Sequence, residues 1–246
     1  MRKNYFDIPI SIIEKEQLLF EVIEKGKSRE GGFLCALNAH MTAESQHNLQ
    51  LKEALVRADW VVTDGAPVAW AVSHFLGRKQ DRIAGMDITP ELLSRMEQAQ
   101  MTLSVYGNTD ENLDKFRSYV TEHHPGLKIG ALISPPFRPL TREETQGYLE
   151  ELNNSGTHIL FTSLGCPKQE IWMSKHLDEF NFVAMGIGNA INTVVGTEKR
   201  APQFLQKVGM EWFYRFIQNP KRLFKRYFMT NTHFLFLVAR QKFRKA

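Results

Sequence analysis

The amino-acid sequence predicts an α/β protein in which a mostly parallel sheet is flanked by helices. Six short apolar runs alternate with segments of helical pattern along the chain. The runs are apolar almost without interruption, as strands are when helices cover both faces of a sheet. The segments between them are long enough for the crossover helices that parallel strands require. Together these observations indicate consecutive βαβ units.

In the first half of the chain, strands are expected at residues 33–37 and 60–63, where the apolar runs are shortest and most continuous. A helix is expected from about Thr42 to Arg57, and another after Pro67. A third is predicted over residues 87–100, with Thr89 as N-cap and Pro90 at the first helical position.

In the second half, strands are expected at residues 101–106, 127–133, 158–164 and 182–186. Asn108 or Thr109 caps a helix that runs to about His123. Thr141 and Glu144 form the pattern of a capping box at the start of the next helix. A further helix is expected from Pro167 to about Glu179.

The composition indicates a folded protein of the reducing cytoplasm. The chain has 246 residues and is 43% hydrophobic, enough to form a core. Its two cysteines, Cys35 and Cys166, lie in apolar, strand-like contexts, which argues against a disulfide framework. No Cys/His spacing indicates a metal site. No stretch suits a signal peptide or approaches the roughly 20 apolar residues of a membrane span.

The charge is distributed unevenly. From Trp212 onward the chain carries nine basic residues, ten aromatic residues and no Asp or Glu, so the net charge of +4 conceals a mildly acidic body. Lys221, Arg222, Lys225 and Arg226 share one helical face. Such a basic, aromatic helix suits either an anionic membrane surface or nucleic acid.

Polar and glycine residues follow five of the predicted strands. In parallel α/β sheets the ligand lies beyond the carboxyl ends of the strands. That rule selects the following residues as the candidate crevice: Asn38, Asp64, Gly107 and Asn108, Gly165 to Gln169, and Gly186 to Asn189.

Each of these positions has a functional and a structural interpretation. Asp64 could act as a general base, because partial burial raises a carboxyl pKa, or could cap the next helix. Asn38 could hydrogen-bond a ligand or cap a helix, and His40 could be an acid, a base or a surface residue. The Gly165-Cys-Pro-Lys-Gln-Glu170 segment could hold a diphosphate through free N–H groups and Lys168.

Two further segments carry weaker signals. Gly186-Ile-Gly188 matches only part of the dinucleotide fingerprint, so a tight turn is the simpler interpretation. Arg82 and Asp87 lie in one short loop, where the arginine could pair with a diphosphate or form a local salt bridge.

Seven motifs, taken together in order and spacing, resemble the WecG/TagA/CpsF family of bacterial glycosyltransferases over about residues 6–226. They are Asn38-Ala39, Asp64-Gly65, Arg82-x-Ala-Gly-x-Asp87, Gly165-x-Pro167-Lys-Gln169-Glu170, Gly186-x-Gly188, Gly196-x3-Arg200-Ala-Pro202 and Glu211-Trp-x-Tyr-Arg215.

The resemblance implies a Rossmann-like catalytic domain, here residues 1–205, followed by a helical appendage, residues 206–246, that meets the membrane. It implies an inverting transfer from a UDP-sugar to a polyprenyl-diphosphate-linked saccharide at the inner face of the cell membrane, without a metal or other cofactor. The family builds teichoic acid linkage units and cell-surface polysaccharides. The donor sugar stays open among N-acetylmannosamine, its uronic acid, glucose and another hexose, as do the acceptor and the oligomeric state.

By position, the resemblance makes Asp64 the catalytic base that deprotonates the acceptor hydroxyl. Arginines of the appendage are implied to approach the diphosphate. The full set of implied substrate contacts is Asn38, Arg82, Asp87, Gly107, Asn108, Gly165, Pro167, Gln169, Gly186, Gly188, Arg200, Arg215, Arg222 and Arg226. Family members often have an aromatic-Asp pair where this chain has Ile191-Asn192, so no role is assigned to Asn192, nor to His40.

Two alternatives remain. A different Rossmann-type enzyme with a nucleotide cofactor would need a glycine loop after the first strand, which residues 33–40 do not offer. A nucleic-acid-binding protein would rely on the basic tail alone, beside an acidic body. If the tail instead docks on a membrane, deletion of residues 212–246 should abolish both vesicle binding and transfer.

Overall fold

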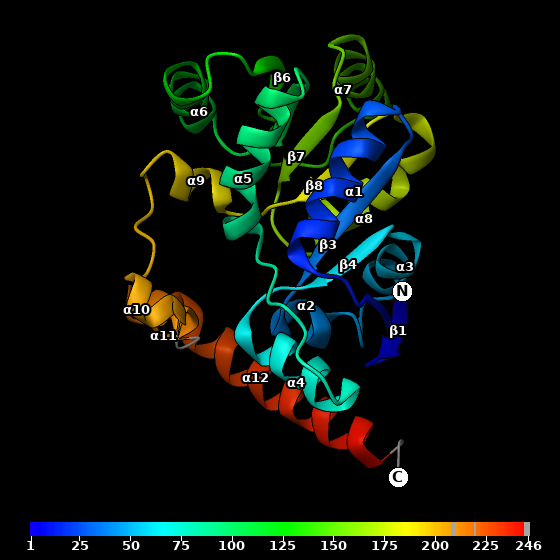
Figure 1. Ribbon diagram of the computed structural model, residues 1–246, viewed down its shortest axis with the longest axis vertical. Coiled ribbons are helices and arrows are strands. Elements are labelled where there is room, and N and C mark those ends of the chain that lie inside the picture. The colour runs from blue at the N-terminus through cyan, green and yellow to red at the C-terminus, as the bar shows by residue number, and fades with distance from the viewer. Residues whose placement is uncertain (208–209, 219, 244–246) are drawn as a thin grey trace.

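A computed structural model describes residues 1–207, 210–218 and 220–243, and its centre is a six-stranded, wholly parallel sheet (Figure 1). The strand order is β4-β3-β8-β7-β5-β6. The strands are β3 (Gly32–Leu37), β4 (Trp60–Thr63), β5 (Thr102–Gly107), β6 (Lys128–Ile133), β7 (Ile159–Ser163) and β8 (Val183–Gly186). All six predicted strands are present, each within one residue of its expected ends, and the α/β prediction is confirmed.

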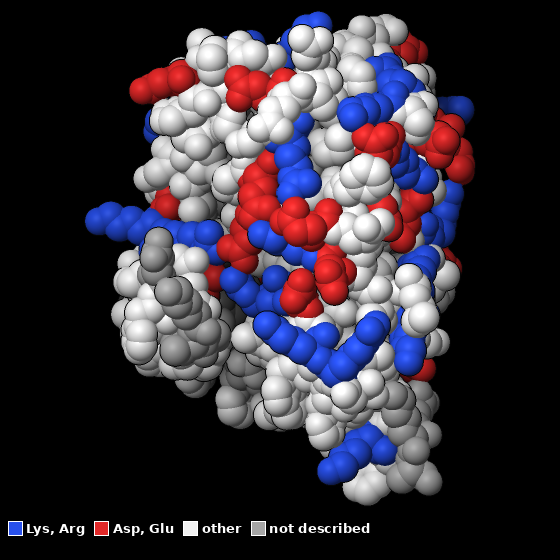
Figure 2. Space-filling view, in the orientation of Figure 1, with Lys and Arg blue, Asp and Glu red and all other residues white. Residues whose placement is uncertain are grey.

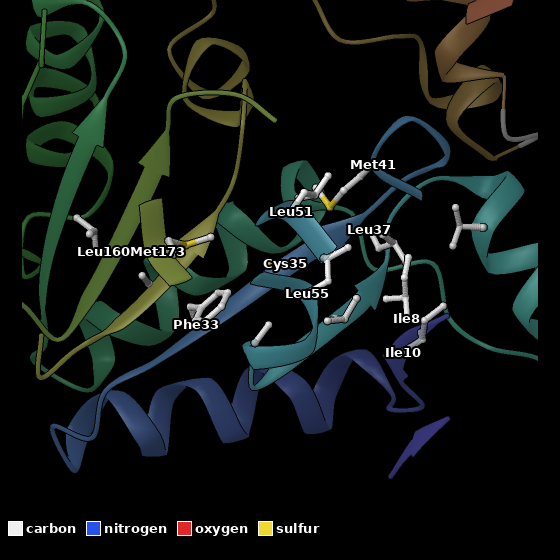
Figure 3. Packing of buried hydrophobic residues seen from close by; sticks show 14 of the residues in the cluster. Ile8, Ile10, Phe33, Cys35, Leu37, Met41, Leu51, Leu55, Leu160 and Met173 are labelled. Carbon is white, nitrogen blue, oxygen red and sulfur yellow. The ribbon is translucent and has the colours of Figure 1, made fainter. Parts of the chain in front are cut away.

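Helices cover both faces of the sheet. They are α1 (Lys15–Lys27), α2 (Ala39–Glu44), α3 (Leu49–Arg57), α4 (Ala66–Leu76), α5 (Gly85–Gln98), α6 (Asp110–His123), α7 (Arg142–Asn154), α8 (Lys168–Lys175) and α9 (Ala190–Val194). Alternate residues of β3 face opposite layers. Leu34 and Ala36 pack with α1 and α5, whereas Phe33, Cys35 and Leu37 pack with α3 (Figure 3). This double cover explains the uninterrupted apolar runs.

Two of the predicted helix boundaries are wrong. The helix expected over residues 42–57 is two helices, because Asn48 caps α3 and breaks the chain after α2. Helix α5 begins at Gly85, four residues before Thr89, which lies inside it and donates to the carbonyl of Gly85 at 2.7 Å. Pro90 is the sixth residue of α5, so it lies inside the helix and not at its first position. The caps at Thr109 and Thr141, including the capping box with Glu144, are confirmed.

An N-terminal hairpin precedes the sheet and was not predicted. It consists of β1 (Arg2–Tyr5) and β2 (Ile8–Ser11), paired antiparallel. The two turn residues, Phe6 and Asp7, both have positive φ, 58° and 60°. Such turns usually carry Asn or Gly, so the sequence lacked the customary signal. Ile8 and Ile10 of β2 are fully buried in the α3 layer of the core (Figure 3).

Of the C-terminal helices, α12 runs beneath α2 and α4, and α10 and α11 lie to the left of it (Figure 1). They are α10 (Gln203–Lys207), α11 (Glu211–Gln218) and α12 (Pro220–Phe243). The second half of α12 contributes to the core: Phe234 and Leu237 are buried, and the Phe234 ring lies 5.6 Å from that of Phe6. Arg240 pairs with Asp7 at 2.9 Å. Deleting residues 212–246 would therefore also open the core. None of the helices in the described ranges is both long and apolar enough to cross a membrane.

Candidate active site

A cavity of about 590 Å³ lies at the carboxyl ends of β3, β4 and β8. Its walls come from the loops that follow these strands and from the first turns of α4 and α5. Residues of α11 and α12 line it as well: Glu211, Trp212, Thr230, Asn231, Phe234 and Leu235. The volume suits a small organic ligand. The position is the one that the crevice rule for parallel sheets selects.

Asp64 lies on the wall of this cavity at the end of β4. Its backbone N–H donates to the carbonyl of Leu37 at 2.8 Å, which ties it to the end of β3. Helix α4 takes Gly65 as its N-cap, so the capping interpretation of Asp64 is wrong. Gly65 has φ 85° and ψ 144°, a conformation that glycine reaches far more readily than other residues, and this turn leaves the half-buried Asp64 carboxyl beside the cavity.

The capping interpretation of Asn38 is confirmed, and the residue also stands at the cavity. Its side-chain oxygen accepts from the N–H of Met41 at 3.0 Å and caps α2, and the residue also lines the cavity. No described residue accepts a hydrogen bond from its Nδ2. The cap therefore fixes the side chain and leaves the amide donor for a ligand.

Three of the longer helices have N-termini that face the cavity without a side-chain cap, and the five-residue α9 adds a fourth at Gly188 and Asn189. Those of α4 and α5 line it through Gly65 to Pro67 and Ala84 to Met86, and that of α8 lines it through Gly165, Cys166 and Gln169. By contrast, α3, α6 and α7 are capped by side chains. Uncapped N–H groups and the positive ends of helix dipoles favour an anionic ligand.

Four charged side chains form a cluster that joins the start of α5 to α11. Arg82, which lines the cavity, pairs with Asp87 at 2.6 Å and with Glu211 at 3.5 Å. Arg200 pairs with the other oxygen of Asp87, and its Nε lies 3.8 Å from Glu211. The local salt bridge expected for Arg82 therefore exists, and it belongs to a larger cluster. Asp87 and Arg200 hold this cluster together behind the cavity wall.

Gln169 and Glu170 form a buried polar pair at the start of α8. Gln169 is 3% exposed and Glu170 is 0% exposed, and the Gln169 Nε2 donates to the Glu170 Oε1 at 2.7 Å. The Gln169 Oε1 accepts from the N–H of Gly165 at 3.2 Å. Burial raises the pKa of Glu170 to about 7, although hydrogen bonds from Gln169 and neighbouring groups oppose the rise. Only Gln169 of this pair lines the cavity.

Gly107, Asn108 and Pro167 do not line the cavity. The strand order places β5 beyond β7, away from β3 and β4, and the sequence could not reveal that order. A Cβ at Gly107 would lie 2.6 Å from the backbone of Ser163, so this glycine permits close approach of two strand ends. Asn108 donates to Asn192 at 2.7 Å, and Asn192 donates to the cavity residue Asn189 at 2.7 Å. Asn108 and Asn192 thus support the wall from behind.

The remaining predicted residues divide into two groups. Gly165, Gly186, Gly188 and His40 line the cavity. The side chains of three basic residues of the appendage lie outside what the structure describes: Arg215, Arg222 and Arg226.

Several cavity residues were not predicted: Trp70, Met86, Trp212, Thr230, Asn231, Phe234 and Leu235. Those on α12 had a usable signal. Residues 230, 231, 234 and 235 are spaced i, i+1, i+4 and i+5, so they share one helical face, and Thr230 and Asn231 begin a short polar stretch of the helix. In the described parts of the chain, no three His, Cys, Asp or Glu side chains are grouped to hold a metal.

Comparison with known proteins adds to this geometry. The model of the glycosyl transferase WecG/TagA/CpsF family matches residues 3–246. The chain belongs to this family. It is therefore a glycosyltransferase, and the resemblance carried by the seven motifs is confirmed. A relative from Bacillus spizizenii is 30% identical over 195 residues, which cover 78% of this chain and 74% of the relative. That relative is an N-acetylglucosaminyldiphosphoundecaprenol N-acetyl-β-D-mannosaminyltransferase.

Proposed function

We propose that this glycosyltransferase moves N-acetylmannosamine from a UDP donor to a polyprenyl-diphosphate-linked N-acetylglucosamine in the synthesis of a cell-envelope polymer. The acceptor and sugar are those in the name of the Bacillus spizizenii relative. The observation that carries the proposal is the position of Asp64, whose carboxyl lies at a cavity that three uncapped helix N-termini also face.

In the proposed reaction Asp64 takes the proton of the acceptor hydroxyl. The oxygen then attacks the anomeric carbon of the donor from the side opposite the diphosphate, the new C–O bond forms, and the bond to the diphosphate breaks. The relative's product is β-linked. From an α-linked nucleotide donor, a β-linked product requires this inversion.

The departing UDP carries the negative charge that develops during transfer. We assign its stabilisation to the N-termini of α4, α5 and α8 and to the guanidinium of Arg82, with no metal required. Of the two ion pairs of Arg82, the one with Glu211 is the longer, at 3.5 Å. A phosphate could therefore replace the Glu211 carboxylate with little loss of interaction energy. EDTA should accordingly leave the rate unchanged.

The acceptor is lipid-linked, so the enzyme should work at a membrane surface. Large apolar side chains are exposed on the appendage: Phe204, Trp212, Phe213, Ile217, Phe224, Phe228, Met229, Leu235, Phe236 and Phe243. Figure 2 shows acidic side chains gathered over α1 and α5, and the sequence from Trp212 onward contains no Asp or Glu. Apolar side chains and a basic sequence together suit peripheral binding to an anionic leaflet.

The test is UDP release by the purified protein with anionic vesicles, a polyprenyl-diphosphate-N-acetylglucosamine acceptor and a panel of UDP-sugars, with EDTA present. We expect turnover with UDP-N-acetylmannosamine and a loss of at least about 10²-fold in kcat for Asp64→Asn, because general base catalysis contributes roughly 10²–10⁴-fold. Asp110→Asn, an exposed carboxylate in the first turn of α6, is the matched control. An Asp64→Asn enzyme with full activity would refute the assignment of the base, and turnover with another sugar alone would refute that of the donor.

A further inference from the structure

The Gln169–Glu170 pair has a feature that the transfer reaction as written does not use. Glu170 is a fully buried carboxyl, and in the described parts of the chain no lysine or arginine forms an ion pair with it. Its ionisable neighbours are the thiols of Cys35 and Cys166, and burial raises the pKa of Cys35 well above its usual value. A buried carboxyl without a cation destabilises the fold. A group with this stability cost is expected to have a function.

The hydrogen bonds around Gln169 indicate that this function is to fix the orientation of the Gln169 side-chain amide. A glutamine amide can turn over and exchange its oxygen and nitrogen, since the two ends have nearly the same shape. The Glu170 Oε1 accepts both in the carboxylate and in a carboxyl protonated at Oε2, so it requires the nitrogen of Gln169 on its side. The N–H of Gly165 can only donate, so it requires the oxygen on the other side. The two contacts select the same orientation.

The backbone of β8 packs closely against the side chains of Gln169 and Glu170 at Gly186. A Cβ at Gly186 would lie 2.7 Å from the Gln169 Nε2 and 3.2 Å from the Glu170 Oε1. The amide therefore has little room for a second position. One of the two Nε2 protons is used by Glu170, and the other remains for a group in the cavity that Gln169 lines.

We propose that Glu170 is a positioning residue: its carboxylate fixes the Gln169 amide so that an N–H, and not a carbonyl, is presented to the substrate. The substrate group that meets Gln169 is then a hydrogen-bond acceptor, an oxygen of the sugar or of the diphosphate. This inference rests on the proposed transfer for its kinetic consequence, whereas the orientation of the amide does not depend on it.

The kinetic test is a double-mutant cycle of Gln169→Met, Glu170→Gln and the double variant, assayed with UDP-N-acetylmannosamine. Glu170→Gln should lower kcat/KM by about tenfold, the equivalent of one misplaced hydrogen bond. In the double variant the loss should be no larger than that of Gln169→Met alone, because Glu170 acts through Gln169. Independent, additive losses would overturn the proposal.

A second measurement needs neither substrate nor activity. In ¹⁵N-labelled protein, the side-chain amide of Gln169 gives two proton signals, identified by their absence in Gln169→Met. The proton bonded to the carboxylate should lie downfield and move upfield in Glu170→Gln, and Glu53→Gln, on the exposed face of α3, should leave it unchanged. A Gln169 amide indifferent to Glu170→Gln would overturn the proposal even if transfer is observed. A shifted amide without transfer of any sugar would count against the proposed function alone.

Discussion

At the scale of single residues, the site includes one group that destabilises the fold, the buried carboxyl of Glu170. Asp64 lies between the end of β4 and the turn at Gly65, and Arg82 pairs with two carboxylates. Glu170 is fully buried. Proteins tolerate such groups where function requires them. The effect of such a group on the free energy of unfolding can be measured most directly at Glu170.

Glu170 should make the free energy of unfolding depend on pH. Its pKa is raised from 4.5 to about 7 by burial, so the folded protein holds a proton that the unfolded chain releases between these values. Stability from this group is greatest below about pH 4.5 and falls as the pH rises to about 7, by roughly 3 kcal/mol. Urea titrations of the wild type and Glu170→Gln across pH 5–8 measure it. The difference between the two proteins should shift across that window, and a constant difference would contradict the assignment.

A single methyl group at Gly186 should impair the site without unfolding it. The added Cβ would displace the Gln169 amide, which lies 2.7 Å from its position, so Gly186→Ala should lower kcat/KM at least about tenfold. Gly147→Ala is a suitable control, since a Cβ there meets nothing within 4 Å and α7 should gain stability. Equal activity of the two variants would show that the close contact at β8 has no role in transfer.

At the scale of elements, strands were easier to predict than helix boundaries. A buried parallel strand is a continuous apolar run, so all six were found. Helix starts depend on which of several capping residues is used, and Asn48 and Thr89 offered equally good patterns with opposite outcomes. The hairpin at residues 2–11 was missed because Phe6 and Asp7 adopt positive φ without the usual turn residues.

The exposed face of α12 should carry membrane binding. Phe224 and Phe228 are one helical turn apart, their rings stack, and both are exposed. Replacing both with serine should weaken binding to anionic vesicles by roughly tenfold or more, because serine lacks the apolar ring that each phenylalanine would bury in the membrane interface. Vesicle co-sedimentation measures this, with Phe137→Ser, an exposed phenylalanine in the loop before α7, as control. Unchanged binding would place the membrane contact elsewhere.

At the scale of the whole molecule, the sheet order decides which predicted residues meet. Sequence alone selected five strand ends, and the structure brings four of them to one cavity while Gly107 and Asn108 lie beyond β7. The cluster of Arg82, Asp87 and Arg200 was predicted only as separate contacts, since its members are more than 110 residues apart along the chain at their widest. Glu211 shows why the whole fold matters: it reaches the cavity from another helix.

The ends of the chain should also prove energetically linked. Phe234 is 2% exposed and packs on Phe6, so Phe234→Ala should destabilise the protein by about 3–5 kcal/mol. Thermal unfolding measures the loss, and Phe236→Ala, an exposed neighbour on the same helix, should cost little. Equal effects of the two substitutions would mean that the end of α12 does not belong to the core.

The same contact limits how this enzyme can diverge from its relatives. The face of α12 that carries Phe234 and Arg240 is matched to the Phe6–Asp7 turn at the opposite end of the chain. The outer face has no such partner constraint in the described structure and is free to change with the membrane or the acceptor. A chimera that exchanges the last helix between two family members should therefore fold only when the N-terminal hairpin is exchanged with it. Substitutions in these two distant segments are accordingly expected to be coupled.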